Sequence, residues 1–256
     1  MATAEEVRRA ATEIKARKSV AALTGAGISV ESGIPDFRSP GGIWTRYDPM
    51  EYATIDAFLA APRKVWPFLI ELGELLEGAR PNAGHVALAA LEAAGWLAGV
   101  ATQNVDGLHQ AAGSKRVLEL HGGPGRLRCV KCQRAAPIER EALRAAVRAG
   151  APPRCEVCGG LLKPDVVLFG EALPAGVFAE VERLVDRAGA LLVVGTSATV
   201  WPVAGLPARA REAGALVVEV NLEATELTGD VAQLSLFGKA GEVLPALVEA
   251  IREARL

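Results

Sequence analysis

Four cysteines form the clearest chemical pattern in the sequence. They make two Cys-x-x-Cys pairs, Cys129 with Cys132 and Cys155 with Cys158, and 22 residues separate the pairs. Four thiolates at this spacing can close a tetrahedron around one Zn²⁺ ion, and four protein ligands leave no position open for a substrate. We therefore expect one structural zinc ion. A redox-active dithiol and a nucleic-acid-binding zinc ribbon are the alternatives.

Small and polar residues directly follow two short apolar runs. Gly25-Ala26-Gly27 follow the run 19–24, and the backbone amides of such a turn can approach a phosphate. The segment 102–109 follows a second run, and its polar side chains suit sugar hydroxyls or an amide group. Val30 stands where a dinucleotide-binding fingerprint has its third glycine, which disfavours a classical dehydrogenase.

The third chemical feature is His121, which follows the apolar run 117–120. Histidine is the usual general base near neutral pH, so His121 is the candidate base. Of the other two histidines, His85 lies in a helical pattern and is expected to be structural. His109 could serve either purpose.

Alternating elements must position these residues. Short apolar runs predict strands at 19–24, 100–103, 117–120, 166–169, 191–195, 216–221 and 233–236. Helical patterns cover 4–17, 83–94, 175–188, 203–213 and 242–253. Alternation of this kind predicts an α/β fold with a Rossmann-like parallel sheet.

Two stretches interrupt the alternation and predict a second domain. Residues 36–79 are rich in Pro and Gly and then helical, whereas residues 122–165 contain every cysteine. We expect a large Rossmann-like domain formed by 1–35, 80–121 and 166–256. The helical module 36–79 and the zinc module 122–165 would form the smaller domain. A ligand would then bind between the two domains.

Composition limits the class of protein. Hydrophobic residues make up 50% of the chain and charged residues 23%, which excludes a disordered chain. The net charge of −2 disfavours nucleic acid as the primary ligand. No apolar run could span a membrane and the N-terminus carries no apolar signal, so we expect a cytoplasmic protein without a membrane partner.

Taken together, the motifs resemble those of the sirtuins, the NAD-dependent protein-lysine deacylases, and the short ends resemble bacterial-type members. The matching segments, in the family's order, are 25–29, 32–39, 102–109, 121–122, the two cysteine pairs, 163–171, 195–197, and Asn221 with Glu223. The resemblance implies that NAD is consumed and that the partner is an acyl-lysine protein or peptide. The implied products are nicotinamide, O-acyl-ADP-ribose and free lysine.

The resemblance also implies roles for single residues. His121 would be the general base, and Asn104 would address the nicotinamide ribose and its water. Val167 and Phe169 would pair with the substrate backbone. Asp106 would hold the nicotinamide amide group. The residues implied to bind NAD are Gly25, Ala26, Gly27, Asp36, Phe37, Arg38, Gln103, Asn104, Asp106, Gly195, Thr196, Ser197, Asn221, Glu223 and Ala240.

One position pair bears on the acyl group. Sirtuins that remove acidic acyl groups have a Tyr and, three residues later, an Arg in the helix before the Pro-Asn-Ala-Gly-His segment. Leu69 and Leu72 occupy these places here, and neither can pair with a carboxylate. We therefore expect neutral acyl groups: acetyl, with propionyl or longer as extensions. The alternative functions are mono-ADP-ribosyl transfer and non-catalytic binding of NAD, or of a partner through the zinc ribbon.

Overall fold

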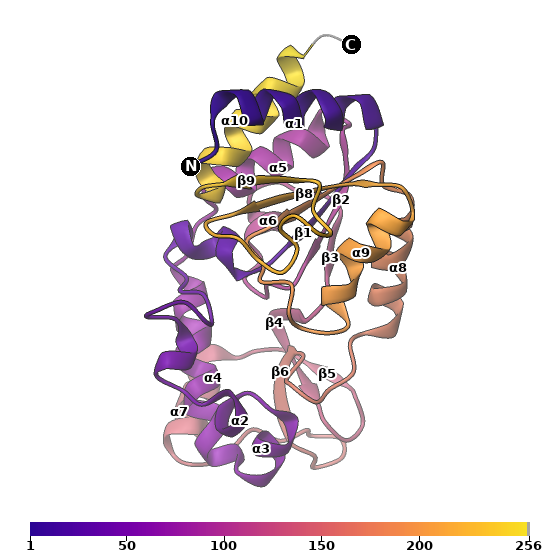
Figure 1. The fold of residues 1–256 in the computed structure, drawn as a ribbon. Helices are drawn as coiled ribbons and strands as arrows, with labels where there is room; N and C mark the ends of the chain where they lie inside the picture. Colours follow the sequence, from indigo (N-terminus) through magenta and orange to yellow (C-terminus); the bar gives the residue numbers. More distant parts are fainter. Residues whose placement is uncertain (255–256) are drawn as a thin grey trace.

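A six-stranded parallel sheet forms the centre of the larger of two lobes in the computed structural model, which describes residues 1–254 (Figure 1). Its strands are β1 (Val20–Thr24), β2 (Leu97–Thr102), β3 (Val117–Glu119), β7 (Ala190–Val194), β8 (Leu216–Asn221) and β9 (Leu234–Phe237). The strand order is β3-β2-β1-β7-β8-β9, and every neighbouring pair is parallel. Strands β2 and β3 are added on one side of β1, and β7, β8 and β9 are added on the other side. This order places a topological switch point between β1 and β7.

Side chains of alternate residues cover the two faces of the sheet. Val20 and Ala22 of β1 pack into one apolar cluster, which also contains residues of α1 (Ala4–Arg17), α5 (Ala83–Ala93) and α10 (Ala240–Glu253). Ala21 and Leu23 pack into another, with α8 (Ala175–Asp186) and α9 (Leu206–Glu212). A strand with helices on both of its faces is apolar at every position, which explains the continuous apolar runs of the sequence.

The smaller lobe combines both interrupting stretches. It contains a three-stranded antiparallel sheet in the order β5 (Ala135–Ala136), β4 (Gly122–Cys129), β6 (Leu162–Val166). Its helices are α2 (Pro49–Tyr52), α3 (Ile55–Ala60), α4 (Pro62–Glu77) and α7 (Arg140–Arg148). One apolar cluster around Phe58 and Trp66 joins residues from both stretches. The two stretches thus fold as one unit although more than 40 residues of the large lobe separate them in sequence.

Short elements complete the chain: η1 (Ala26–Ser32), η2 (Ile43–Thr45), α6 (Leu108–Ala111) and η3 (Val203–Gly205). The predicted α/β class, with a Rossmann-like sheet and a smaller helical and cysteine-bearing domain, is confirmed. Within residues 1–254, no helix combines the length and the apolar character needed to cross a membrane.

The predicted strand at 166–169 is wrong. Strand β6 ends at Val166 and pairs antiparallel with β4, outside the parallel sheet. Beyond it the chain stays extended: the Val167 amide donates to the His121 carbonyl at 2.8 Å, and the Phe169 amide donates to the Ala53 carbonyl at 2.9 Å. Leu168 packs into the cluster of the smaller lobe. The run is apolar because it crosses between two packed lobes, a pattern that sequence cannot distinguish from a buried strand.

Candidate functional site

A cavity of about 1050 Å³ lies where the carboxyl ends of the parallel strands meet the smaller lobe. Open parallel sheets bind ligands at such an edge, next to the switch point. The site residues expected from sequence that line it are Gly25, Ala26, Gly27, Asp36, Phe37, Arg38, Leu69, Leu72, Gln103, Asn104, His121, Val167, Phe169, Gly195, Thr196, Ser197, Asn221, Glu223 and Ala240. Segments far apart in sequence therefore meet in one space.

Direct contact between two backbone turns forms the floor of this cavity. The Gly27 amide donates to the Gly195 carbonyl at 2.8 Å. A Cβ on Gly27 would lie 2.7 Å from the Gly195 Cα, and a Cβ on Gly195 would lie 2.4 Å from the Ile28 nitrogen. Gly195 also has φ +59°, in the left-handed region. Glycines are needed here because the two turns contact each other through backbone atoms. The backbone amides are therefore not covered by side chains at the point where a phosphate would be bound.

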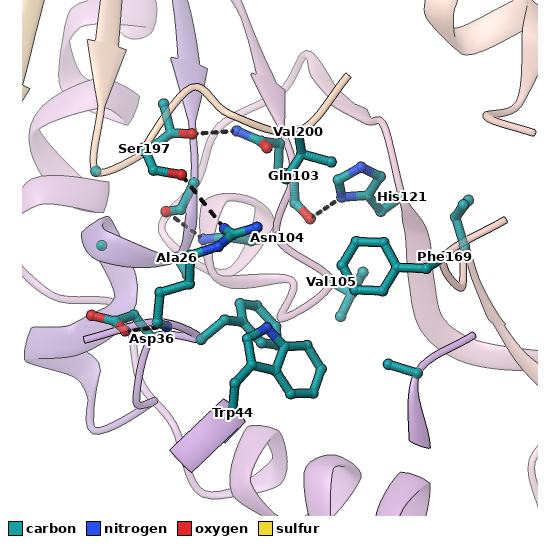
Figure 2. A pocket seen from close by; sticks show the side chains of 18 of the residues that line it. Ala26, Asp36, Trp44, Gln103, Asn104, Val105, His121, Phe169, Ser197 and Val200 are labelled. Atoms are coloured by element: carbon teal, nitrogen blue, oxygen red, sulfur yellow. Dashed lines mark hydrogen bonds between the residues drawn. The ribbon is translucent and has the colours of Figure 1, made fainter. Parts of the chain in front are cut away.

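Amide side chains at the end of β2 tie three strand ends together. The Asn104 Nδ2 donates to the Gly25 carbonyl at 3.1 Å and to the Ser29 Oγ at 3.0 Å. The Gln103 Nε2 donates to the Thr196 Oγ1 at 2.9 Å (Figure 2). Because these nitrogens are engaged, the amide oxygens of both side chains stay available as acceptors for ligand hydroxyls or water.

The tautomer of His121 follows from its partner. Its Nδ1 lies 2.9 Å from the Gln103 carbonyl oxygen (Figure 2). A carbonyl can only accept, so Nδ1 carries the proton and Nε2 keeps a lone pair. Burial lowers the pKa of His121 below its ordinary value, although the hydrogen bond to Gln103 opposes this shift. At neutral pH the ring is therefore neutral and can accept a proton at Nε2.

Asp106 does not line the cavity, unlike the other expected NAD residues. Its Oδ2 accepts from the Ser29 Oγ at 2.7 Å, and its Oδ1 accepts from the Leu108 amide at 2.9 Å. Ser29 in turn accepts a hydrogen bond from Asn104. Asp106 thus lies behind Asn104, joined to it through one hydroxyl.

The two remaining histidines are buried beneath this layer. Their rings lie 4.9 Å apart in an edge-to-face arrangement, and the His109 Nε2 lies 2.9 Å from the Thr24 Oγ1. Burial lowers the pKa of His85 to about 4 and that of His109 to about 3. Both are therefore neutral at physiological pH, and neither lines the cavity. His109, which the sequence left open, occupies the same structural setting as His85.

The loop 36–44 covers one side of the cavity. The Asp36 carboxylate accepts from the Arg38 amide at 2.9 Å and from the Ser39 amide at 2.7 Å, which fixes the turn. Arg38 reaches across to the Ser197 Oγ at 3.5 Å, and the Phe37 ring packs 5.1 Å from Trp44. The loop therefore spans from the strand ends to the smaller lobe.

Several lining residues were not found from sequence. The Trp44 ring centroid lies 6.3 Å from that of Phe68 and 6.4 Å from that of Phe169, and Figure 2 shows Trp44 and Phe169 on the same side of the cavity. Val105 and Val200 also line it. They are apolar residues in loops, and the only sequence signal for Trp44 was its place in an aromatic-rich segment. The wall contributed by the smaller lobe is otherwise apolar and contains Ala53, Phe68, Leu69, Leu72 and Leu168.

The four cysteines form a separate cluster whose members do not line the cavity. Their sulfur atoms all lie within 4.8 Å of one another, with 3.4 Å between Cys129 and Cys158 and 3.8 Å between Cys132 and Cys155. Tetrahedral Zn–S bonds of about 2.3 Å require sulfur separations of about 3.8 Å. Backbone hydrogen bonds, first that from Cys132, lower the pKa of the Cys129 thiol, whereas the neighbouring sulfur atoms raise the pKa of Cys158. The donor set fits one zinc ion held by four thiolates, with a structural role.

Comparison with known proteins gives one consistent result. Residues 25–202 match the model of the Sir2 family. A Pyrobaculum aerophilum protein named NAD-dependent protein deacylase 2 is 50% identical over 90% of each chain. A Sir2 enzyme structure matches with a TM-score of 0.89 and 42% identity, covering 99% of this chain and 100% of the other. A Sir2 protein bound to a myristoylated histone peptide matches with a TM-score of 0.78 and 37% identity, covering 98% of both chains.

The glycine contact yields a stability prediction. Gly195→Ala adds a methyl group 2.4 Å from the Ile28 nitrogen at a φ of +59°. We expect the free energy of unfolding, measured in urea, to fall by more than about 2 kcal/mol. Gly214→Ala is the matched control, because its φ is +92° but no atom lies within 4 Å of the added Cβ. That variant should lose only about 1 kcal/mol, and equal losses would contradict the close-contact argument.

The cysteine cluster yields a metal prediction. We expect the purified protein to contain one zinc ion per chain by atomic absorption, and Cys158→Ser to lose the ion and to unfold at a lower temperature. Val157→Ser is the control, since this exposed residue lies between Cys155 and Cys158 and is no ligand. Wild-type protein without zinc, but with thiols that oxidise in pairs, would instead support the dithiol alternative.

Proposed function

The chain belongs to the Sir2 family and is an NAD-dependent protein deacylase, and we propose that it removes neutral acyl groups from lysine side chains of proteins. One observation carries the proposal. A single cavity joins the glycine turns, the neutral His121 ring and the apolar wall of the smaller lobe. NAD and an acyl-lysine side chain can therefore meet beside a general base.

The orientation of NAD follows from the position of the base. His121 must lie near the ribose that carries nicotinamide, at the end of β3. The glycine turns between β1 and β7 would then hold the diphosphate through their backbone amides. The adenosine half would extend toward the end of β8, along Asn221 and the residues after it. Asn104, with its oxygen free to accept, would bind the nicotinamide ribose or its water.

The chemistry needs one proton acceptor and protection from bulk water. The acyl oxygen attacks the ribose carbon as its bond to nicotinamide breaks, and nicotinamide leaves. His121 Nε2 then takes the proton of a ribose hydroxyl, whose oxygen attacks the former acyl carbon. Water completes the cycle and gives free lysine and O-acyl-ADP-ribose. The loop 36–44 would cover the reacting groups, since Arg38 already spans to Ser197.

The substrate backbone would bind along the extended segment after β6. Val167 donates its amide to His121 and Phe169 donates to Ala53, so this segment is already fixed at the cavity edge. Because both amides are already engaged, and the Phe169 carbonyl accepts from the Ile55 amide at 2.9 Å, an extended peptide would pair through the remaining main-chain groups at this edge. The acyl chain would then enter the wall formed by Leu69 and Leu72, where an unpaired carboxylate would be costly to bury.

A mass-spectrometric time course tests the proposed activity. NAD is offered with one peptide in acetyl-, butyryl- and succinyl-lysine forms, and peptide mass and nicotinamide are followed together. We expect the acetyl and butyryl groups to be lost with an equal amount of nicotinamide, and succinyl to be lost at least about tenfold more slowly. Nicotinamide release without peptide change would favour ADP-ribosyl transfer. No change in either product would favour a binding protein.

A paired variant provides the control for the acyl pocket. Leu69→Tyr combined with Leu72→Arg supplies a hydroxyl and a guanidinium to this wall, and should raise the rate for succinyl relative to acetyl. Leu69→Phe combined with Leu72→Met changes the same side chains without adding a polar group and should not. If both double variants respond alike, the two positions do not select the acyl group.

His121 yields a pH prediction. The neutral ring is the active form, and burial lowers its pKa, so activity should persist as pH falls to the ordinary histidine value and decline only below about 6.5. The measurement is kcat/KM against pH. His121→Ala should lose at least about a hundredfold in kcat while still binding ADP-ribose. An inflection above the ordinary histidine value, or full activity of this variant, would exclude His121 as the base.

A further inference from the structure

A buried acid lies inside the apolar strand β8. Glu219 is 1% exposed, and its side chain lies on the same face of the sheet as Val217, toward the cluster that contains α8 and α9 residues. A carboxylate at such a position is costly unless it is fully hydrogen-bonded. The cavity residues do not include Glu219. Its place in the structure therefore needs a separate explanation.

Three hydroxyl groups converge on this carboxylate. Its Oε1 accepts from the Thr225 Oγ1 at 2.5 Å. Its Oε2 accepts from the Thr228 Oγ1 at 2.6 Å and from the Ser235 Oγ at 2.9 Å. Three hydrogen bonds satisfy both oxygens of a carboxyl group that burial has removed from water. The acid thus holds two residues of the loop that follows β8 and one residue of β9.

The hydroxyl groups of Thr225 and Thr228 also bind backbone amides of the loop that follows β8. The Thr225 amide donates to the Thr228 Oγ1 at 2.9 Å, and the Leu227 amide donates to the Thr225 Oγ1 at 3.1 Å. Each threonine therefore accepts from the backbone while it donates to Glu219. This arrangement fixes the path of residues 225–228 from within the core.

The near end of this loop forms part of the cavity wall. Leu222, Glu223, Ala224 and Thr225 all line the cavity, whereas Thr228 and Ser235 do not. Leu222 is 58% exposed and Glu223 is exposed, so little packing holds this stretch in place. The hydroxyls bound to Glu219 supply the fixed end that such a stretch needs.

We propose that Glu219 is a positioning residue that sets the geometry of residues 222–225 for the adenosine half of NAD. It acts from behind the wall, through Thr225 and Thr228, and does not itself contact the ligand. The inference rests on the proposed function, because it takes the orientation of NAD from the position of His121. An apolar side chain could fill the same space in β8, but it could not hold the two threonines.

The experiment separates positioning from simple stability. Thr228→Val removes one hydroxyl that binds Glu219 but lies outside the cavity. Ser235→Ala is the matched control, because it removes another hydroxyl from the same carboxylate, in β9 and not in the loop. The Kd of ADP-ribose is measured by titration calorimetry, together with KM for NAD, KM for an acetyl-lysine peptide, kcat and the unfolding temperature.

We expect Thr228→Val to raise the Kd of ADP-ribose and the KM for NAD about three- to tenfold, with kcat and the peptide KM unchanged. Ser235→Ala should lower the unfolding temperature and leave the Kd unchanged. Thr228→Ser, which keeps the hydroxyl, should restore wild-type affinity. Glu219→Gln, which keeps the volume but not the charge, should weaken ADP-ribose in the same selective way.

Two results would overturn the inference and leave the proposed function standing. If Thr228→Val and Ser235→Ala change ADP-ribose affinity equally, the acid serves general stability. If neither changes it while wild-type protein binds ADP-ribose, the loop does not depend on Glu219. Wild-type protein that binds no ADP-ribose would instead remove the proposed function, and the inference with it. The wild-type titration thus distinguishes the two failures.

Discussion

The contact between the turn after β1 and the turn after β7 is the constraint on which the site depends. Gly27 and Gly195 meet backbone to backbone, so no side chain can separate the two strand ends. Every polar group of the cavity floor is then placed relative to this contact. Gln103 is fixed on Thr196 and Asn104 on Gly25, and the Asn221 Nδ2 donates to the Thr196 carbonyl. A change at the glycines therefore moves groups from four strands at once.

The positions of the polar groups in the cavity depend on two acids that do not themselves line it, the half-buried Asp106 and the buried Glu219. Asp106 holds Ser29, which accepts from Asn104, and Glu219 holds the loop after β8. Each of these acids has hydrogen-bond donors within the fold, so neither carboxyl group is left without a partner. His121 is also held by a partner within the fold. The backbone carbonyl of Gln103, the residue that follows β2, fixes the proton of the ring on Nδ1. The ring is thus oriented by the main chain and not by another side chain.

The sequence predicted an element or a site correctly where the residue types of a segment were compatible with only one structural environment. Val and Leu runs at 191–194 and 216–218 required cover on both faces, and the polar residues that follow β7 and β8 required partners at a strand end. It failed at 166–169, because an apolar extended segment between two lobes has the same composition as a buried strand. It also missed Trp44, since a single aromatic residue in the three-residue element η2 carries no spacing signal. Glu219 could have been found: an acid within a buried strand must have donors nearby.

The two lobes contribute two chemically different surfaces to the cavity, one polar and one apolar. The edge of the parallel sheet offers bare amides, amide side chains and a neutral histidine, which suit a charged and hydroxyl-rich dinucleotide. The smaller lobe offers an apolar wall around Leu69 and Leu72, which suits an acyl chain. Because the smaller lobe has its own core and a cysteine cluster away from the cavity, its wall can differ in sequence without disturbing the sheet edge. Under the proposed function, substitutions in α4 would alter acyl selectivity, whereas the groups that would face NAD lie on the glycine contact and in front of the two acids.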